Sequence, residues 1–188
     1  MIAANGTVAT MDLQGKLLIA MLGMSDPRFD RSVIVLCAHS ENGAMGPIIN
    51  KPSRELRLSA LAEHLGIPDV PKGRDIRVHI GGPVESGRGF VLHSDDWSEG
   101  QATMAIPGGL GMTATVDILE ALATGTGPRE ALLALGYAGW GPGQLESEIR
   151  RNDWLIADPG ADVIFAAEDG KKWSRALKAM GVDPVTLS

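Results

Sequence analysis

Three of the four histidines, His39, His79 and His93, lie at or near the ends of predicted strands. Three converging imidazoles with one open coordination position would suit a catalytic zinc ion. However, the chain has no H-x-H pair and no H-E-x-x-H pattern to fix two of them together. Hydrogen-bonded structural histidines are therefore the favoured interpretation, and neither a metal nor a cofactor is predicted.

The candidate nucleophiles have weak support. Ser94 lies between His93 and Asp95, but a catalytic triad is assembled in space rather than from neighbours, and the G-x-S-x-G pattern is absent. Cys37, the single cysteine, falls in the middle of an apolar strand, where a free thiol usually packs in the core. No catalytic residue is predicted, although a hydrolase that uses His39 or His93 remains an alternative hypothesis.

Four basic residues, Arg28, Arg31, Lys51 and Arg88, fall in predicted loops or at strand ends. If these ends converge, the four side chains would form an electropositive pocket for a carboxylate or phosphate. Salt bridges that anchor loops are the simpler explanation, and we favour it.

The stretch from Gly136 to Glu146 combines four glycines with Tyr137 and Trp140 and reaches Gln144 beside a predicted helix start. Glycine permits tight turns and close backbone approaches, so the rings could cover a bound ligand or a strand-to-helix corner. We favour the corner. The candidate ligand-binding residues are Arg28, Arg31, His39, Lys51, Arg88, His93, Tyr137, Trp140 and Gln144.

These residues are positioned by a predicted α+β domain. Strands are expected at 17–22, 32–39, 44–50, 76–80, 89–94, 103–106, 154–157 and 163–167. Helices are expected at 58–65, 113–124, 128–135 and 142–151 and around Trp173 to Met180. The Asn42-Gly43 pair predicts a hairpin between the second and third strands, and Pro47 places the third at an edge or a bulge. The segment from Gly109 to Ala114 resembles a dinucleotide loop, but without a βαβ unit it is interpreted as a loop before a capped helix.

No regular alternation of strands and helices appears. We therefore predict a single domain over 15–188 around a mixed, largely antiparallel sheet, preceded by a flexible segment at 1–14.

Charge and hydropathy argue against nucleic-acid binding and against membrane insertion. A net charge of −6 argues against direct nucleic-acid binding, because such proteins present clustered Lys and Arg. No apolar run approaches the roughly 20 residues of a membrane span, and the first residues lack the pattern of a signal peptide. A cytoplasmic protein with no membrane partner is expected.

Several motifs together resemble the YqgE/AlgH family. They include Gly15 to Met21, Asp26 to Phe29, Ile49 to Pro52, Gly81 to Val84, Arg88 to His93 and the whole of Gly136 to Glu146. Leu22 and Pro47 depart from the usual pattern of the family.

The resemblance implies a bifurcated mixed sheet curled into a partial barrel and flanked by helices. It implies no agreed catalytic residues, and some members are called putative transcriptional regulators. We therefore predict a binding or regulatory protein for a small anionic ligand or a protein partner, with indirect transcriptional regulation as a further alternative.

Overall fold

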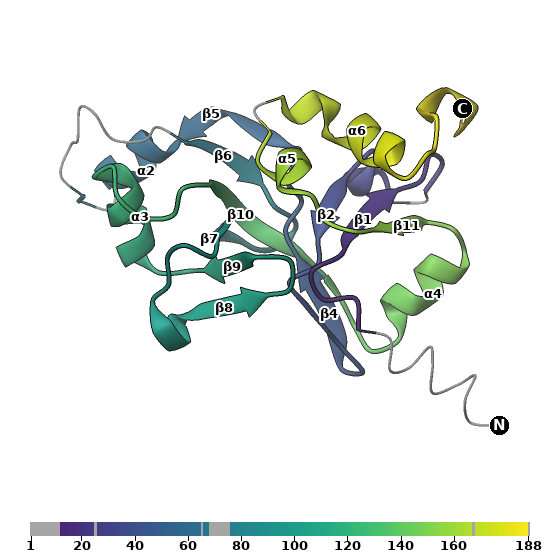
Figure 1. Cartoon of the computed structure of the whole chain (residues 1–188), viewed down its shortest axis with the longest axis horizontal. Coiled ribbons are helices and arrows are strands. Elements are labelled where there is room, and N and C mark those ends of the chain that lie inside the picture. Colours follow the sequence, from purple (N-terminus) through teal and green to yellow (C-terminus); the bar gives the residue numbers. More distant parts are fainter. Residues whose placement is uncertain (1–11, 25, 65, 68–75, 167, 188) are drawn as a thin grey trace.

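The computed structural model describes residues 12–24, 26–64, 66–67, 76–166 and 168–187. Within them the chain forms two sheets with helices at both ends of the molecule (Figure 1). Most of the segment expected to be flexible, 1–14, lies outside the described residues. The part that is described is held in place, because Leu13 is buried and the Gln14 side chain donates to the Cys37 carbonyl at 2.9 Å.

The smaller sheet has the order β11-β1-β2 and is antiparallel. The larger sheet has the order β3-β4-β10-β7-β9-β8, with β6 paired to β10 and β5 paired to β6. The strands are β1 Leu17–Ala20, β2 Val33–Val35, β3 Ala38–Ser40, β4 Gly43–Gly46, β5 Pro52–Arg57, β6 Arg77–Ile80, β7 Val84–Ser94, β8 Thr103–Ile106, β9 Leu110–Thr113, β10 Ala131–Trp140 and β11 Trp154–Ala157. All pairs are antiparallel except β6 with β10, which confirms the mixed, largely antiparallel sheet.

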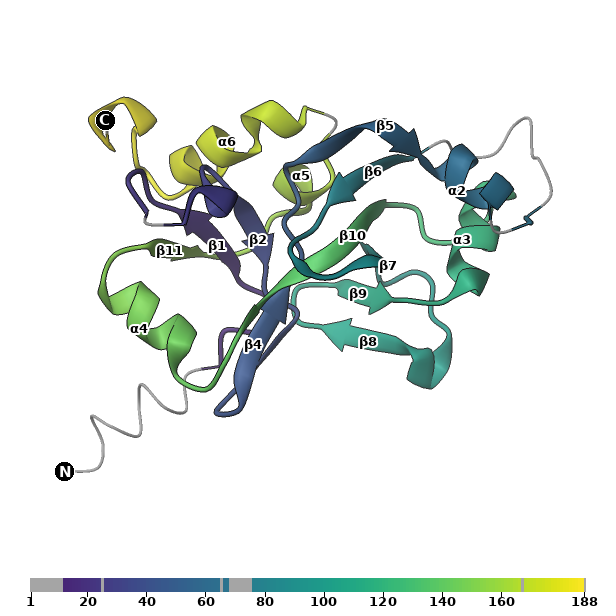
Figure 2. The same cartoon turned by 180° about the vertical axis from the view of Figure 1, so that it is seen from behind.

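The helices are short. The α-helices are α2 Leu58–His64, α3 Val116–Ala123, α4 Gln144–Arg150, α5 Ala161–Ile164 and α6 Lys172–Ala179. Single 3-10 turns are η1 Pro27–Phe29, η2 Gly100–Ala102, η3 Asp169–Lys171 and η4 Pro184–Leu187. Figure 2 shows α2 and α3 at the far end of the larger sheet, whereas α4 lies near β11. None of the described helices is long and apolar enough to cross a membrane.

Strand β10 organises the larger sheet. One of its edges pairs with β7; the other pairs first with β6, through Leu133 to Leu135, and then with β4, through Ala138 to Trp140. The sheet divides where the second edge passes from β6 to β4. This is the bifurcation of a sheet that curls into a partial barrel (Figure 1).

Glycines occupy the dividing point because backbones meet there without room for side chains. Gly136 has φ +75°, and a Cβ on it would lie 2.4 Å from the Gly82 carbonyl oxygen. A Cβ on Gly82, whose φ is +150°, would lie 2.2 Å from the Tyr137 carbonyl carbon. The glycines of this stretch are therefore required by the path of the sheet, whether or not a ligand binds there.

Two element predictions were wrong. The predicted helix at 128–135 is instead a short non-helical stretch at 128–130 followed by the start of β10, in which Leu132, Leu133 and Ala134 are all buried between neighbouring elements. A strand covered on both faces has a continuous apolar run, which periodicity alone does not separate from a helix. The predicted strand at 163–167 does not form: Val163 and Ile164 end the single turn α5, Phe165 and Ala166 follow it without strand structure, and Ala167 lies outside the described residues.

Other predicted elements were correct in part. The predicted strand at 32–39 divides into β2 and β3, which join different sheets, although the hairpin across Asn42-Gly43 is confirmed by the pairing of Ser40 with Gly43. The segment that resembled a dinucleotide loop lies largely in β9, and the cap of α3 is Thr115 rather than Thr113. Cys37 is fully buried, and burial raises the pKa of its thiol to about 12, as expected of a core cysteine.

Candidate functional site

The nine candidate ligand-binding residues do not form one site. His39, Tyr137 and Trp140 line a cavity of about 480 Å³ between the β3–β4 hairpin and the end of β10. Arg31 and Lys51 line a different cavity of about 360 Å³ beside η3. The other four candidates, Arg28, Arg88, His93 and Gln144, do not line either of these cavities.

The imidazole of His39 is fixed in one tautomer. Its Nδ1 accepts a hydrogen bond from the Leu13 amide at 3.1 Å, so the proton of the neutral ring lies on Nε2. Nε2 donates to Glu146 Oε2 at 2.8 Å. Burial raises the pKa of Glu146, but the interactions with His39, a backbone hydrogen bond and the nearby Arg150 together outweigh burial, so the pKa is lowered. Both ring nitrogens thus have protein partners, and the ring ties the N-terminal segment to α4.

Trp140 and Gln144 are also engaged by the protein. The indole N–H of Trp140 donates to Glu148 Oε1 at 3.0 Å, and Trp154 donates to the same oxygen at 3.0 Å. Gln144 donates to Glu148 Oε2 at 3.0 Å and accepts from the Gly141 amide at 3.0 Å. This network closes the turn between β10 and α4.

The four predicted basic residues do not share one pocket, although Arg31 and Lys51 line the same cavity. Arg28 pairs with Asp26 at 2.7 Å within its own turn, and Arg88 pairs with Glu85 at 3.4 Å. Lys51 donates to the Asp30 carbonyl at 2.9 Å, while the Arg31 guanidinium lies 5.3 Å from the centre of the Trp173 ring. Each side chain contacts its own neighbourhood, which agrees with anchoring of loops rather than with one shared pocket.

His93 is fully buried and ends a chain of hydrogen bonds. Its Nδ1 faces the Ser94 carbonyl oxygen at 2.8 Å and therefore carries the proton. Nε2 accepts from the Thr113 hydroxyl at 2.8 Å, which accepts in turn from the Thr103 hydroxyl at 2.8 Å. Both ring nitrogens are engaged, so the geometry leaves neither available to a substrate.

Acidification should weaken the contribution of His93 to stability. Burial lowers its pKa below the ordinary value of 6.5, against the opposing effects of the Ser94 carbonyl and Asp96. The unfolded chain then binds the proton more readily, so the stabilisation is complete above 6.5 and declines as the pH falls below it. Urea unfolding of the wild type and His93→Gln across this range measures the effect. The variant should show a shallower pH dependence, and parallel curves would contradict it.

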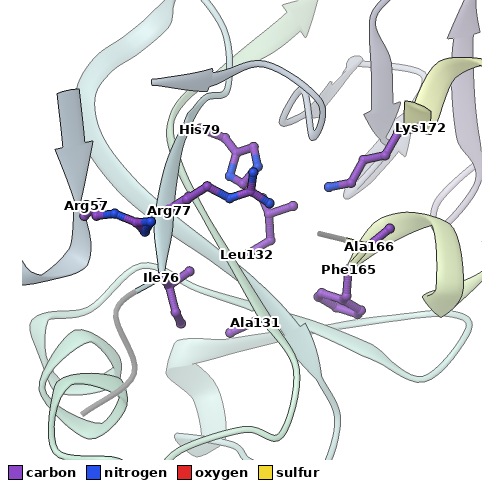
Figure 3. Close-up of a pocket in the computed structure, with 9 residues that line it drawn as sticks. All are labelled: Arg57, Ile76, Arg77, His79, Ala131, Leu132, Phe165, Ala166 and Lys172. Atoms are coloured by element: carbon purple, nitrogen blue, oxygen red, sulfur yellow. The ribbon is translucent and has the colours of Figure 1, made fainter. Parts of the chain in front are cut away.

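A further cavity, of about 500 Å³, gathers basic side chains that the sequence had not singled out as a group. Arg57, Arg77, His79 and Lys172 line it from β5, β6 and α6 (Figure 3). Its remaining walls are largely apolar, formed by Ile76, Ala131, Leu132, Phe165 and Ala166. The cavity therefore combines a basic side with an apolar side.

Asp169, at the start of η3, binds these basic groups together. Its Oδ1 accepts from His79 Nε2 at 2.9 Å and lies 2.8 Å from Lys172 Nζ. Its Oδ2 lies 3.0 Å from an Arg77 nitrogen but has no hydrogen bond of good geometry. Burial raises the pKa of Asp169, but its partners, first His79 and then Lys172, outweigh burial and lower the pKa.

Local structure explains why the residues converge. Arg77 and His79 are two residues apart on β6 and share a face of the strand. Arg57 is the direct partner of Arg77 across the β5–β6 pair. Like charges opposite each other destabilise a sheet unless an anion lies near them.

The sequence held a partial signal for this cluster. The alternation of Arg77 and His79 and the three-residue spacing of Asp169 and Lys172 are both visible in it. However, nothing in the sequence brings β6 and α6 together, because they are about 90 residues apart.

Comparisons with known proteins agree with the fold and define the family. The family model described as AlgH-like matches residues 17–185. A UPF0301 protein of Cereibacter sphaeroides is 60% identical over 178 residues, covering 95% of this chain and 97% of the relative. A UPF0301 protein of Paracoccus denitrificans is 55% identical over 179 residues, covering 94% of each chain.

The solution structure of the AlgH protein from Pseudomonas aeruginosa has a TM-score of 0.76 at 41% identity and covers 92% of this chain and 91% of its own. The chain therefore belongs to the AlgH-like family, which confirms the resemblance noted from its motifs.

Proposed function

We propose that this protein binds a small organic anion in the basic cavity formed by Arg57, Arg77, His79 and Lys172. The observation that carries the proposal is the convergence of Arg77, His79 and Lys172 from β6 and α6 around the buried carboxylate of Asp169, with Arg57 of β5 lining the same cavity. His79 and Lys172 are buried beside the cavity and both are paired with Asp169, as buried basic side chains must be, whereas Arg57 is exposed and Arg77 is half-buried.

The chemistry of the walls suggests the ligand. Guanidinium groups hold carboxylates and phosphates through paired N–H donors. The apolar side, with Phe165 and Leu132, suits a carbon skeleton. A carboxylate or phosphate ester with an apolar portion therefore fits both sides, and its size is limited by a cavity of about 500 Å³. This site differs from the glycine-rich stretch from Gly136 to Glu146, where the sequence offered a ligand site as the alternative to the favoured structural corner.

Binding can be tested by thermal unfolding in the presence of inorganic phosphate, phenyl phosphate and lactate. A ligand that binds only the folded state raises the melting temperature in a concentration-dependent way. We expect at least one of these anions to raise the melting temperature of the wild type. Arg77→Gln should weaken the apparent affinity for that anion at least about tenfold, the loss expected for one charge-assisted contact.

The matched control is Arg88→Gln. Arg88 is exposed and pairs with Glu85, and it does not line the cavity. This variant should bind the anions as the wild type does. If no anion shifts the wild type, or if both variants lose binding equally, the proposal fails.

A further inference from the structure

Lys172 is buried at the wall of the basic cavity, with 1% of its surface exposed. Its Nζ donates to the Ile49 carbonyl at 2.8 Å and lies 2.8 Å from Asp169 Oδ1. Figure 3 shows the nitrogen end of Lys172 directed toward the side of the cavity that holds Arg77 and His79. The group is thus held in place by two acceptors while it faces a cavity.

The surroundings of Lys172 favour loss of the ammonium proton. Burial, together with the nearby Arg77 cation, lowers the pKa of Lys172 against the opposing effect of Asp169. A neutral amine has two hydrogens, which match the two acceptors, and its lone pair occupies the remaining direction. Asp169 keeps Arg77 and His79 as partners when Lys172 loses its proton, so its own negative charge stays compensated.

We propose that Lys172 forms a reversible imine with a small carbonyl-bearing anion, such as a 2-oxo acid, held in the basic cavity. The inference rests on the proposed anion binding. Imine formation adds a covalent step to that binding. A desolvated lysine beside other cationic groups is a known kind of activated nucleophile.

The step is balanced in atoms and charge. The ammonium of Lys172 first releases a proton to water, and the nitrogen lone pair then forms a bond to the carbonyl carbon. The C=O π electrons move to oxygen, which takes up one proton from the nitrogen and the proton first released to water. The C–O bond then breaks, water leaves, and the nitrogen lone pair completes the C=N bond. The product is a protonated imine, so one ammonium and one carbonyl compound give one iminium and one water. Arg57 and Arg77 would hold the anionic group of the ligand, while Phe165 contacts its carbon skeleton.

Reductive trapping tests the inference. The full-length protein is incubated with pyruvate, phenylpyruvate or glyceraldehyde 3-phosphate and sodium cyanoborohydride, and the adduct is located by peptide mass spectrometry. We expect one reduced adduct on Lys172 with at least one probe. Lys172→Arg should lose it, and inorganic phosphate should protect against it.

Lys171→Arg is the matched control, because Lys171 is the exposed neighbour that pairs with Glu168. It should form the same adduct as the wild type. Trapping on the wild type does not depend on whether Lys172→Arg folds. The absence of an adduct with all three probes, or labelling confined to exposed lysines, would overturn the inference. If lactate and pyruvate raise the melting temperature alike but none of the three probes is trapped, anion binding stands and imine formation falls.

Discussion

Replacing Asp169 with alanine should lower the free energy of unfolding by roughly 3–5 kcal/mol, the usual effect of removing one partner from a buried ionic group. The change leaves His79 and Lys172, both buried, without the carboxylate that they share, and it removes the ion pair with Arg77. Urea unfolding at neutral pH measures the loss.

The adjacent Glu168→Ala is the control. Glu168 pairs with Lys171 and Arg175 at the surface, where ion pairs contribute little, so its removal should leave stability nearly unchanged. The pKa of folded Asp169 lies below the ordinary value of 3.8, so its stabilisation is present above 3.8 and lost as the pH falls through the folded pKa. Asp169→Ala should lack this acid-side loss. Equal stability of the two variants would show that Asp169 does not hold the cluster together.

The Asp169→Ala variant also provides a further test of the anion site. Inorganic phosphate can replace part of the missing negative charge, so it should raise the melting temperature of Asp169→Ala more than that of the wild type. A shift of the same size in both proteins would mean that phosphate acts elsewhere.

Replacing Gly136 with alanine should cost roughly 4 kcal/mol or prevent folding. Overpacking typically costs about 1–3 kcal/mol, and a left-handed backbone costs a non-glycine residue about 1–2 kcal/mol more. Gly136 has φ +75°, and its Cβ would meet the backbone of Gly82 at 2.4 Å, where nothing flexible can move aside. Chemical unfolding, or the soluble yield if no folded protein forms, measures the effect.

Two other glycines separate the effect of the left-handed backbone from the effect of crowding by neighbouring backbone. Gly143 has φ +74° but no described residue has an atom within 4 Å of its added Cβ, so Gly143→Ala should show the left-handed cost alone, about 1–2 kcal/mol. Gly87 has neither a positive φ nor a close neighbour, and Gly87→Ala should be nearly neutral. If Gly136→Ala costs no more than Gly143→Ala, backbone crowding is not what requires glycine at the division of the sheet.

Local chemistry predicted many elements. The Asn42-Gly43 turn predicted the hairpin, the apolar run at 17–22 predicted β1, and the amphipathic spacing around Trp173 predicted α6, because turn preference and periodicity act over a few residues. Local chemistry failed at β10, whose apolar run has no periodicity to separate strand from helix. It failed again at 32–39, where one apolar stretch supplies strands to two sheets.

The sequence by itself determined the family, the α+β class and the core position of Cys37, and it favoured a structural corner over a ligand loop for the glycines around Gly136. The close backbone approach that requires glycine at position 136 is visible only in the tertiary structure. Only the tertiary structure decided which charged residues meet. The predicted basic set lies dispersed, whereas β6 and α6, distant in sequence, bring Arg77 and His79 to Asp169 and Lys172. Loop and strand positions constrain where a side chain starts, but the contacts between charges depend on how strands pair and helices pack. Those arrangements are fixed by long-range burial, which no local pattern encodes.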